Sequence, residues 1–397
     1  MMNGKKKLLI VNNNLDLGGI QKSLINLLWE LDKRKIYDID LFLFSNTGEY
    51  KTEIPPSIKV FEGNKFIKTL GVSQMDSKKI GVFYYFFRGG SAFYARIIDR
   101  RLPVRFILST QKKFTNYDAS ISFMQDSNEH SLYGCCNSFV IDRVHAKRKI
   151  AFVHCDFLSH GNNWLSRLLY EKFDAIATVS ESCKENFIKA TPKLKNNVFT
   201  VLNCQNYDEI KKLSNVNCIV YENANFNIFT AARISSEKGI IRTINVIEKL
   251  VKDNKNVLWH IVGSGPLEYE VKAIIRSKKL EKNIILYGNQ YNPYRYMKNA
   301  DLLLVPSFHE AAPMVFDEAK YLGIPILTTK TASAVEMVER DGAGWVCENN
   351  EEGIYNSLKY ILDNQKELTR VKEHLNNLCF NNNTAAAQFI NLVEGRK

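Results

Sequence analysis

Short apolar runs alternate with helical segments along both halves of the chain, and this alternation limits the possible fold more than any other feature of the sequence. Six runs in the first half are expected to be strands: KLLIV, IDLFLF, DASISFM, KIAFVH, DAIATVS and VFTVL. Five runs in the second half have the same character: FNIFTAA, VLWHIVG, NIILYG, DLLLVPS and IPILTT. Strands that alternate with helices indicate parallel sheets with helices on both faces. The sequence therefore predicts an α/β protein.

The length of the chain indicates two such domains, because 397 residues exceed what one hydrophobic core usually organises. A polar, Asn-rich segment over residues 203–225 separates the two sets of strands. We expect Rossmann-like domains over residues 1–205 and 206–380, and a terminal helix over 381–397 that can dock back on the first domain. Ligands of such sheets bind beyond the carboxyl ends of the strands, so a cleft between two facing domains is the expected binding site.

Composition places the chain among ordinary globular proteins, since 45% of its residues are hydrophobic and 24% are charged. It contains no run of about 18 apolar residues, the length that spans a membrane. The leading segment MMNGKKKLLIVNNN has too few apolar residues for a signal peptide. The eight cysteines show no spacing typical of a zinc site. We therefore expect a cytoplasmic protein with reduced thiols.

The net charge of +12 is concentrated in one segment, residues 78–113. This segment holds nine Lys or Arg residues against a single acidic residue, Asp99, and an aromatic cluster over residues 83–87. Such a mixture suits the surface of an anionic membrane. Nucleic acid is an alternative partner, because basic and aromatic residues also contact phosphates and stack on bases. A third interpretation is a solvated basic face over an aromatic core. The residues expected to dock on a membrane are Arg96, Arg100, Arg101 and Arg105.

The stretch PSFHEAAPMVFDEAKYLGIP, residues 306–325, contains two glutamates and predicts a strand end, a turn and a helix. The helix is expected over about 313–322, because Pro313 suits a first helical position and Gly323 is a stop signal. Alanines stand where a capping side chain would be expected, so the N–H groups around Met314 to Phe316 are predicted to be free. A helix start with free donors can bind phosphate. Water or loop backbone could also satisfy these groups.

Other loops at strand ends carry suitable chemistry. Gly18 and Gly19 precede a helix whose start favours an anion, or they form a simple tight turn. The loop AARISSEKG holds Arg233 and Lys238, two cations that can neutralise a diphosphate or remain solvated at the surface. The run VGSGPLEYE includes Gly263 but lacks the third glycine of a dinucleotide fingerprint, and the chain has no P-loop motif.

Together these motifs resemble the retaining nucleotide-sugar glycosyltransferases of the GT-B fold, in the large group called family four or glycosyl transferases group 1. The resemblance rests on R-x-x-x-x-K-G at 233–239, G-x-G-P at 263–266, A-D at 300–301 and P-S-x-x-E-x-x-P-x-V-x-x-E-A-x-x-x-G-x-P at 306–325. The first half matches through its glycine pair and His154. Ala311 and Asn206 depart from the family pattern, where many relatives have Gly and Asp. The variant EAAPMV is similar to bacterial enzymes that build capsular and other surface polysaccharides.

The resemblance assigns roles to the candidate residues. Glu310 would contact hydroxyls of the donor sugar, and Glu318 would reach the ribose. Arg233 and Lys238 would stabilise charge on the leaving diphosphate. His154 would contact the sugar from the opposite domain, with a neutral core histidine as the alternative. The other donor-binding positions that the resemblance implies are Gly18, Gly19, Gly263, Asn289, Gln290, Ser307, Ala312, Pro313, Met314 and Val315.

The resemblance further implies hexosyl transfer from a nucleotide-sugar, with a UDP-sugar as the expected donor and without a metal or other cofactor. Retention would result from same-face displacement in which the leaving phosphate removes the acceptor proton. The expected acceptor is a lipid-linked or membrane-proximal glycan or glycolipid at the inner face of the cell membrane, and no nucleic-acid partner is expected. Two alternatives stay open. One is a GT-B enzyme of another reaction, such as a nucleotide-sugar epimerase or sugar phosphorylase, and the other is a basic module that binds membranes or nucleic acid.

Overall fold

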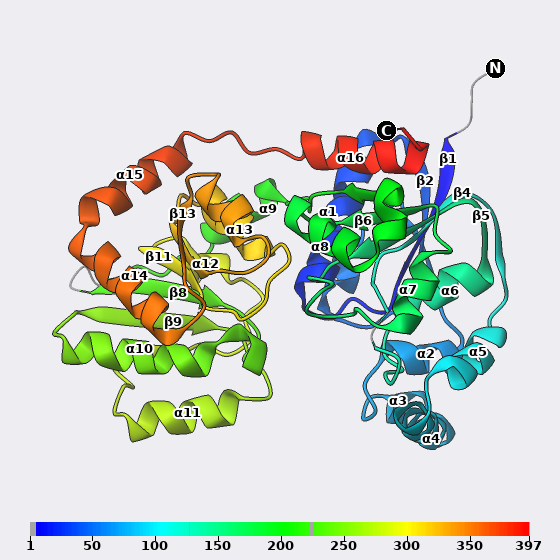
Figure 1. The fold of residues 1–397 in the computed structure, drawn as a ribbon, viewed down its shortest axis with the longest axis horizontal. Coiled ribbons are helices and arrows are strands. Elements are labelled where there is room, and N and C mark those ends of the chain that lie inside the picture. The colour runs from blue at the N-terminus through cyan, green and yellow to red at the C-terminus, as the bar shows by residue number, and fades with distance from the viewer. Residues whose placement is uncertain (1–4, 127, 222–224, 397) are drawn as a thin grey trace. The chain divides into compact units, whose positions relative to one another are not determined.

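The computed structural model describes residues 5–126, 128–221 and 225–396, and it divides into two compact units (Figure 1). Unit 1 contains the chain up to Cys204 together with the segment from Asn382 onward, whereas unit 2 contains Gln205–Asn381. The expected boundaries differ from these by one residue each. Residues 222–224 of the expected boundary segment lie outside the described residues.

Unit 1 is built on a seven-stranded parallel sheet in the order β3-β2-β1-β4-β5-β6-β7. Strand β1 pairs with β2 on one side and with β4 on the other, so the chain winds outward from the middle in both directions. The strands are β1 (Lys6–Asn12), β2 (Tyr37–Leu43), β3 (Lys59–Glu62), β4 (Phe114–Ser122), β5 (Val144–Val153), β6 (Ala175–Thr178) and β7 (Val198–Thr200).

Helices cover both faces of this sheet. Leu8 of β1 belongs to one core cluster and Leu9 to the other, because successive strand side chains point to opposite faces. Helix α1 (Gly19–Arg34) and the C-terminal α16 (Asn383–Glu394) share the cluster of Leu8. The other helices are α2 (Lys65–Gly71), α3 (Ser77–Ile80), α4 (Val82–Ile97), α5 (Arg101–Ser109), α6 (Cys136–Arg143), α7 (Trp164–Tyr170) and α8 (Glu181–Ala190), with 3-10 turns at Glu49–Glu53 and Pro192–Asn197.

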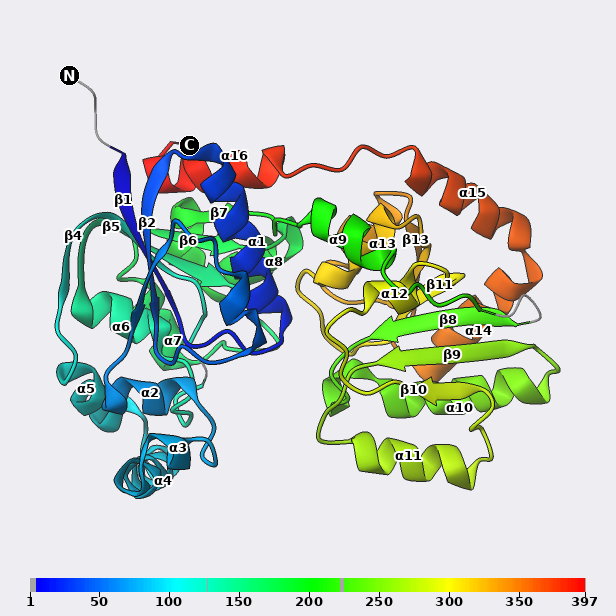
Figure 2. The same cartoon turned by 180° about the vertical axis from the view of Figure 1, so that it is seen from behind.

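Unit 2 repeats this plan with a six-stranded parallel sheet in the order β10-β9-β8-β11-β12-β13 (Figure 2). The strands are β8 (Phe226–Ala231), β9 (Val257–Val262), β10 (Ile284–Leu286), β11 (Leu302–Val305), β12 (Ile326–Thr329) and β13 (Gly344–Cys347). The helices are α9 (Tyr207–Ser214), α10 (Ile240–Lys252), α11 (Glu268–Ser277), α12 (Tyr294–Met297), α13 (Met314–Tyr321), α14 (Glu351–Asp363) and α15 (Gln365–Asn376), with a 3-10 turn at Ser236–Lys238 and a π-helical turn at Val335–Glu339.

The prediction of two parallel sheets with helices on both faces is confirmed, and each expected strand is present. The sequence missed β3 and β13, which are the outermost strands of their sheets. Both are short and partly exposed, so they lack the continuous apolar run that marks a buried parallel strand. Within the described part of the chain, no helix is long and apolar enough to cross a membrane.

Candidate functional site

The candidate residues of unit 2 follow the carboxyl ends of neighbouring strands. Strand β8 pairs with β11 in the middle of the sheet, so the loops after these two strands are adjacent. The loop after β8 carries Arg233 and Lys238, and the loop after β11 leads through Ser307 and Glu310 to α13. The topology therefore brings the two main motifs of the second half to one edge of one sheet.

Glu310 is held by two neighbours through a single oxygen. Lys238 Nζ lies 2.7 Å from Glu310 Oε1, and Ser307 Oγ donates to the same oxygen at 2.7 Å. The pair is largely buried, with 13% of the Glu310 side chain and 25% of the Lys238 side chain exposed. None of the described residues donates to Glu310 Oε2. One carboxylate oxygen is thus fixed in place, while the other can accept a hydrogen bond from a hydroxyl.

Arg233 and Lys238 occupy different environments. Lys238 is committed to the ion pair with Glu310. Arg233 is exposed, and its guanidinium has no hydrogen bond or ion pair with a described residue. Because a guanidinium can bind a phosphate through two parallel hydrogen bonds, Arg233 is the cation of this loop that is available to an anionic ligand.

Two glycines allow these loops to pack backbone against backbone. Gly239, which precedes α10, has φ 67°, and a Cβ there would lie 2.0 Å from Pro306 O. Gly263, which follows β9, has φ 138°, and a Cβ there would lie 2.0 Å from Ala232 O. The Gly263 N–H donates to Gly288 O at 2.8 Å and so links the loops after β9 and β10. Close packing accounts for Gly263, and its role in donor binding stays a prediction.

A buried arginine that the sequence did not single out holds the loop after β11. Arg242 of α10 donates from Nη2 to Pro306 O and to Asn349 Oδ1, each at 2.6 Å. Its guanidinium lies over the Phe308 ring, 3.8 Å from the centroid. Asn349 Nδ2 donates in turn to Phe308 O at 3.0 Å. These contacts fix the backbone that leads to Glu310. A lone basic residue on a helix gives a single sequence no signal for this role.

Helix α13 begins without a side-chain cap. Pro313 occupies the cap position with φ −62° and ψ 123°, and no side chain accepts a hydrogen bond from the first turn. The Phe316 N–H donates to Pro313 O at 3.1 Å, so the expectation that this amide is free is wrong. The described residues provide no acceptor for the N–H groups of Met314 and Val315. Two backbone donors at the helix start are therefore available to an anion.

Glu318 lies inside α13 and is only 8% exposed. Tyr294 of α12, itself buried, donates from its hydroxyl to Glu318 Oε1 at 3.2 Å. A carboxylate at this depth needs such donors, because burial of a charge is costly without them. The sequence predicted Glu318 as a site residue but not Tyr294, since no local pattern connects α12 with α13.

Asn289 and Gln290 lie in the loop after β10, at the same sheet edge as Glu310. Gln290 Nε2 donates to Tyr287 O at 2.8 Å and closes a compact turn, while Asn289 is exposed. Strands β9 and β8 separate β10 from β11. The loop is thus placed at the correct edge, and its contact with a nucleotide base stays a prediction.

Gly18, Gly19 and His154 belong to unit 1. Gly18 is extended, with φ 175°, and precedes α1, which has no side-chain cap; Gly19 is the first residue of that helix. The His154 ring follows β5 and packs against Phe123 and Phe152, with centroid distances of 4.7 and 5.6 Å. Burial lowers the pKa of His154 to about 4, so the imidazole is neutral at neutral pH. Its Nε2 is buried without a partner among the described residues. The geometry of His154 is therefore compatible with both interpretations, a neutral core histidine and a histidine that contacts the sugar.

A polar cluster beside α1 was not predicted from the sequence. Asn14, buried after β1, donates from Nδ2 to Asp16 Oδ2 at 2.8 Å and to Tyr133 Oη at 3.1 Å. Burial and the nearby Glu49 carboxylate raise the pKa of Asp16. The run NNNLD could have indicated this polar cluster, because buried asparagines at the end of a strand need hydrogen-bond partners.

The four arginines predicted to dock on a membrane do not share one surface. Arg100 is 1% exposed and its Nη2 lies 2.8 Å from Asp126 Oδ2 inside unit 1, so its assignment to a docking surface is wrong. Arg96, Arg101 and Arg105 are exposed. The four positions are close in sequence, and only the folded helices show that one of them faces the core.

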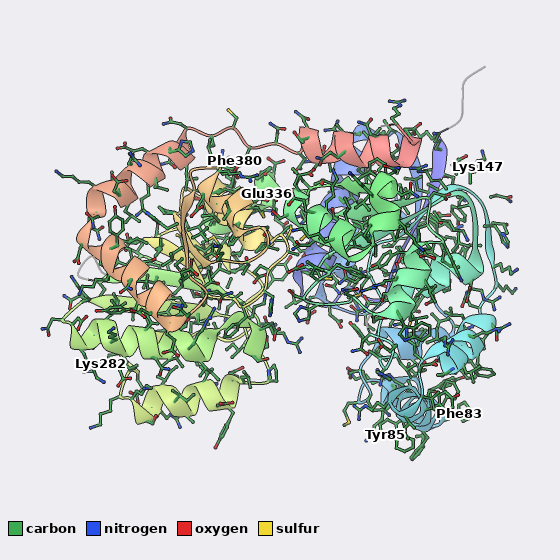
Figure 3. All side chains as sticks on the ribbon, viewed as in Figure 1. Phe83, Tyr85, Lys147, Lys282, Glu336 and Phe380 are labelled. Atoms are coloured by element: carbon green, nitrogen blue, oxygen red, sulfur yellow. The ribbon has the colours of Figure 1, made fainter. Side chains whose placement is uncertain are left out.

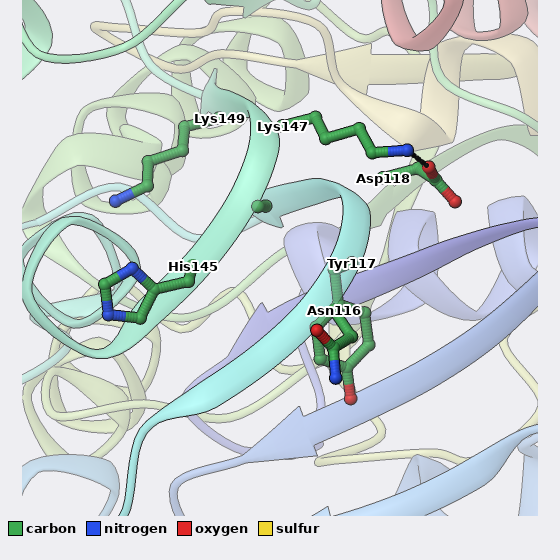
Figure 4. Close-up of a pocket in the computed structure, with 7 residues that line it drawn as sticks. Asn116, Tyr117, Asp118, His145, Lys147 and Lys149 are labelled. Carbon is green, nitrogen blue, oxygen red and sulfur yellow. Dashed lines mark hydrogen bonds and ion pairs between the residues drawn. The ribbon is translucent and has the colours of Figure 1, made fainter.

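A cavity on unit 1 is lined by residues of β4 and β5 (Figure 4). Its lining residues lie within 116–118 of β4 and 145–149 of β5, whereas the candidate loops of unit 1 follow the last residues of their strands. Lys147 Nζ pairs there with Asp118 Oδ1 at 2.7 Å. We assign no part of the site to this cavity, which is lined by Asn116, Tyr117, Asp118, His145, Ala146, Lys147 and Lys149.

The described residues include no group of three or more His, Cys, Asp or Glu side chains that could hold a metal ion. We therefore assign no metal site, and metal independence of the reaction stays a prediction. The groups that could neutralise a diphosphate at this site are the Arg233 guanidinium and the amides that begin α13.

Known proteins match parts of this chain in sequence. Residues 221–377 match the family model of glycosyl transferases group 1. A Campylobacter jejuni protein named N-acetylgalactosamine-N,N'-diacetylbacillosaminyl-diphospho-undecaprenol 4-alpha-N-acetylgalactosaminyltransferase is 26% identical over 222 residues, which are 55% of this chain and 58% of that protein. The capsular polysaccharide biosynthesis glycosyltransferase CapM of Staphylococcus aureus is 28% identical over 188 residues, 44% of this chain and 48% of CapM. The chain thus matches about half the length of these curated relatives.

Solved structures share the fold of nearly the whole chain. Anabaena HepE, crystallised with UDP and glucose, superposes with a TM-score of 0.65 at 17% identity and 98% coverage of both chains. WaaG, a glycosyltransferase involved in lipopolysaccharide biosynthesis, gives a TM-score of 0.62 at 14% identity, with 98% of this chain and 100% of that chain covered. At such identities the likeness concerns the fold, and it establishes the GT-B fold for this chain.

Proposed function

Because residues 221–377 match the family model of glycosyl transferases group 1, we propose that this protein transfers a hexose from a nucleotide-sugar to an acceptor hydroxyl with retention of configuration. The arrangement around Glu310 carries the proposal. One oxygen of this carboxylate is fixed by Lys238 and Ser307, in the loop that leads into an uncapped helix. The other oxygen can receive a hydroxyl of the donor sugar.

The donor diphosphate is proposed to bind at the start of α13. The N–H groups of Met314 and Val315 would donate to phosphate oxygens, and Arg233 would neutralise a further charge. Glu318 would accept from the ribose hydroxyls deeper in the site. Lys238 would act through Glu310, because its ammonium already pairs with that carboxylate.

In the transfer step, the bond between the anomeric carbon and the diphosphate oxygen breaks, and a bond to the acceptor oxygen forms on the same face of the sugar. The departing phosphate oxygen takes the acceptor proton, so the products are a nucleoside diphosphate and the new glycoside. Negative charge grows on the leaving group during this step. Arg233 and the α13 amides therefore stabilise the transition state more than the bound donor.

The proposed substrates are a UDP-sugar and a lipid-linked glycan at the inner face of the cell membrane. The structure of HepE with UDP and glucose supports the uridine nucleotide. The name of the Campylobacter jejuni relative, which contains a diphospho-undecaprenol group, supports a lipid-linked acceptor. CapM and the putative colanic acid biosynthesis glycosyltransferase WcaL of Escherichia coli, 28% identical over 134 residues, support a role in surface polysaccharide synthesis.

A coupled assay tests this proposal. The full chain is incubated with UDP-glucose, UDP-galactose or their N-acetylamino forms and a synthetic undecaprenyl-diphosphate glycan, and UDP release is compared with the mass and anomeric configuration of the product. We expect release of one UDP for each α-linked glycoside formed. Conversion of the donor sugar without an acceptor would indicate an epimerase, and dependence on inorganic phosphate would indicate a phosphorylase. Either result would contradict the proposal.

A further inference from the structure

Helix α4 reverses the usual arrangement of apolar and charged residues. Its buried residues are Arg88 and Ala95. Positions 82, 86, 93 and 97 recur at helical spacing and form one row along the outside, because neighbours on a helix face lie three or four residues apart. This row is strongly exposed, and the exposed fractions are 70% for Val82, 69% for Phe86, 67% for Phe93 and 65% for Ile97.

Buried polar contacts fix this orientation of α4. Arg88 Nε donates to Thr69 O at 2.9 Å, and Arg88 Nη1 donates to Gln74 Oε1 at 3.0 Å. Gln74 Nε2 donates in turn to Tyr85 O at 2.8 Å. Rotation of the helix to bury its apolar row would break these bonds. The Arg88 guanidinium would then move into solvent or stay buried without hydrogen-bond partners, and a buried charge without partners is costly. The apolar row is therefore held outward by the fold.

Helix α5 extends the same surface. Leu102 and Phe106 lie one turn apart and are 63% and 53% exposed. The Phe106 ring contacts the Phe87 and Phe66 rings, each with a centroid distance of 5.9 Å, which connects α5 to α4 and α2. Helices α2 to α5 gather at one end of unit 1 in both ribbon views, and Figure 3 labels Phe83 on α4. We define the docking face as Val82, Phe83, Phe86, Phe93, Ile97, Leu102 and Phe106.

Basic residues surround the docking face. The acidic residues between 65 and 113 are Asp76 and Asp99, and they pair with Lys79 and Arg101. A second copy of this chain would carry the same positive charge, so two such faces would repel each other. An anionic lipid surface complements both the charge and the apolar row. The exposed basic residues between 65 and 113 are Lys65, Lys78, Lys79, Arg96, Arg101, Arg105, Lys112 and Lys113.

We propose that unit 1 docks on an anionic lipid bilayer through this face, with the docking-face side chains in the interfacial region and the basic residues at the level of the lipid phosphates. Helix α4 has 16 residues and would lie in the plane of the interface. This inference goes beyond the proposed transfer reaction, since docking requires neither the donor nor the acceptor.

Vesicle co-sedimentation of the full chain without nucleotide tests the docking. We expect binding to vesicles of phosphatidylglycerol mixed with phosphatidylcholine, and much weaker binding to phosphatidylcholine alone. The double variant Phe86→Ser/Phe93→Ser should weaken binding at least about tenfold, because two exposed aromatic side chains lose their apolar contact with lipid. Its thermal unfolding should match that of the wild type. The matched control is Tyr269→Ser on α11, whose side chain is 87% exposed and should have no effect on binding.

A variant that removes two positive charges separates the electrostatic contribution to vesicle binding from the apolar contribution. Arg96→Gln/Arg105→Gln should weaken binding roughly tenfold and reduce its dependence on salt. Equal vesicle binding by the wild type and Phe86→Ser/Phe93→Ser would overturn the proposal, as would absence of binding to both kinds of vesicle. A concentration-dependent dimer that Phe86→Ser/Phe93→Ser abolishes would also overturn it, because the face would then be an interface between copies. Binding of DNA in place of vesicles would have the same consequence.

Discussion

The loop after β11 and helix α4 distribute charge and apolar surface in opposite ways. In the loop after β11, Glu310 lies largely inside unit 2 and pairs with Lys238 of the loop after β8. At α4, Arg88 lies inside and its hydrogen bonds are satisfied, while Phe86 and Phe93 are exposed. Both regions obey the rule that buried charge needs partners. The two regions differ in what is left without a partner. At the loop, one oxygen of the Glu310 carboxylate has no donor among the described residues, whereas at α4 a whole row of apolar side chains is exposed and would be stabilised only by a partner outside the chain.

The largest effect should come from a buried ion pair near α4. Arg100→Gln leaves the Asp126 carboxylate buried without its cation, so we expect a loss of about 3–5 kcal/mol in the free energy of unfolding, measured by urea titration. Arg105→Gln, which changes an exposed arginine on α5, should cost less than about 0.5 kcal/mol. If both variants lost the same free energy of unfolding, Arg100 would not be the arginine that faces the core.

At the loop after β11, Glu310→Gln should lower kcat for transfer about 10²- to 10³-fold, the loss typical of one group that stabilises the transition state. The amide keeps the shape of the side chain but removes the anion that pairs with Lys238. The free energy of unfolding should therefore fall by about 1–2 kcal/mol, less than for Arg100→Gln, because a quarter of the Lys238 side chain is exposed. Glu270→Gln on α11, an exposed position, is the matched control. Turnover equal to that of the wild type would remove Glu310 from the site.

Acid should destabilise unit 1 through His154. Burial lowers its pKa from 6.5 to about 4, so the unfolded chain binds the proton first as the pH falls. The stability contributed by the neutral ring is complete above pH 6.5 and is lost as the pH falls towards 4, by at most about 3 kcal/mol. His154→Phe should show a correspondingly shallower loss in urea unfolding between these pH values. Parallel curves for the two proteins would mean that the ring is not buried.

The smallest effect is expected for the arginine that positions the loop. Arg242→Lys loses the paired hydrogen bonds and the stacking on Phe308, so kcat/KM should fall roughly tenfold as Glu310 becomes less well placed. Binding of the nucleoside diphosphate alone should not change, because Arg242 supports the loop that meets the sugar. A general loss of diphosphate binding in calorimetry would indicate a structural role instead.

The fold could be predicted from the sequence because buried parallel strands appear as continuous apolar runs. Runs such as DLLLVPS and KIAFVH fall on β11 and β5. Strands β3 and β13 could not be found this way, since both are partly exposed and lack such a run. The other two edge strands, β7 and β10, were found because they lie in the apolar runs VFTVL and NIILYG. The terminal helix was expected, and its packing with α1 became visible only in the structure.

The site was predictable where its chemistry is local in sequence. The stretch 306–325 indicated the helix start at Pro313 and the places of Glu310 and Glu318. Tyr294, which donates to Glu318, and Arg242, which holds the backbone at Pro306, lie in other segments. No pattern in one sequence connects distant segments. The misassignment of Arg100 has a similar origin, because charge counting cannot tell which side of a helix faces the core.

A nucleotide-binding panel tests the central claim most directly. UDP, GDP, ADP and CMP are titrated calorimetrically into the wild type, Arg233→Ala and the control Arg276→Ala, an exposed arginine of α11. We predict that one nucleoside diphosphate binds the wild type and Arg276→Ala equally and binds Arg233→Ala at least about tenfold more weakly, since a charge-assisted contact is lost. Absence of binding by all four nucleotides, or equal binding by all three proteins, would contradict the assignment of a nucleotide-sugar site to unit 2.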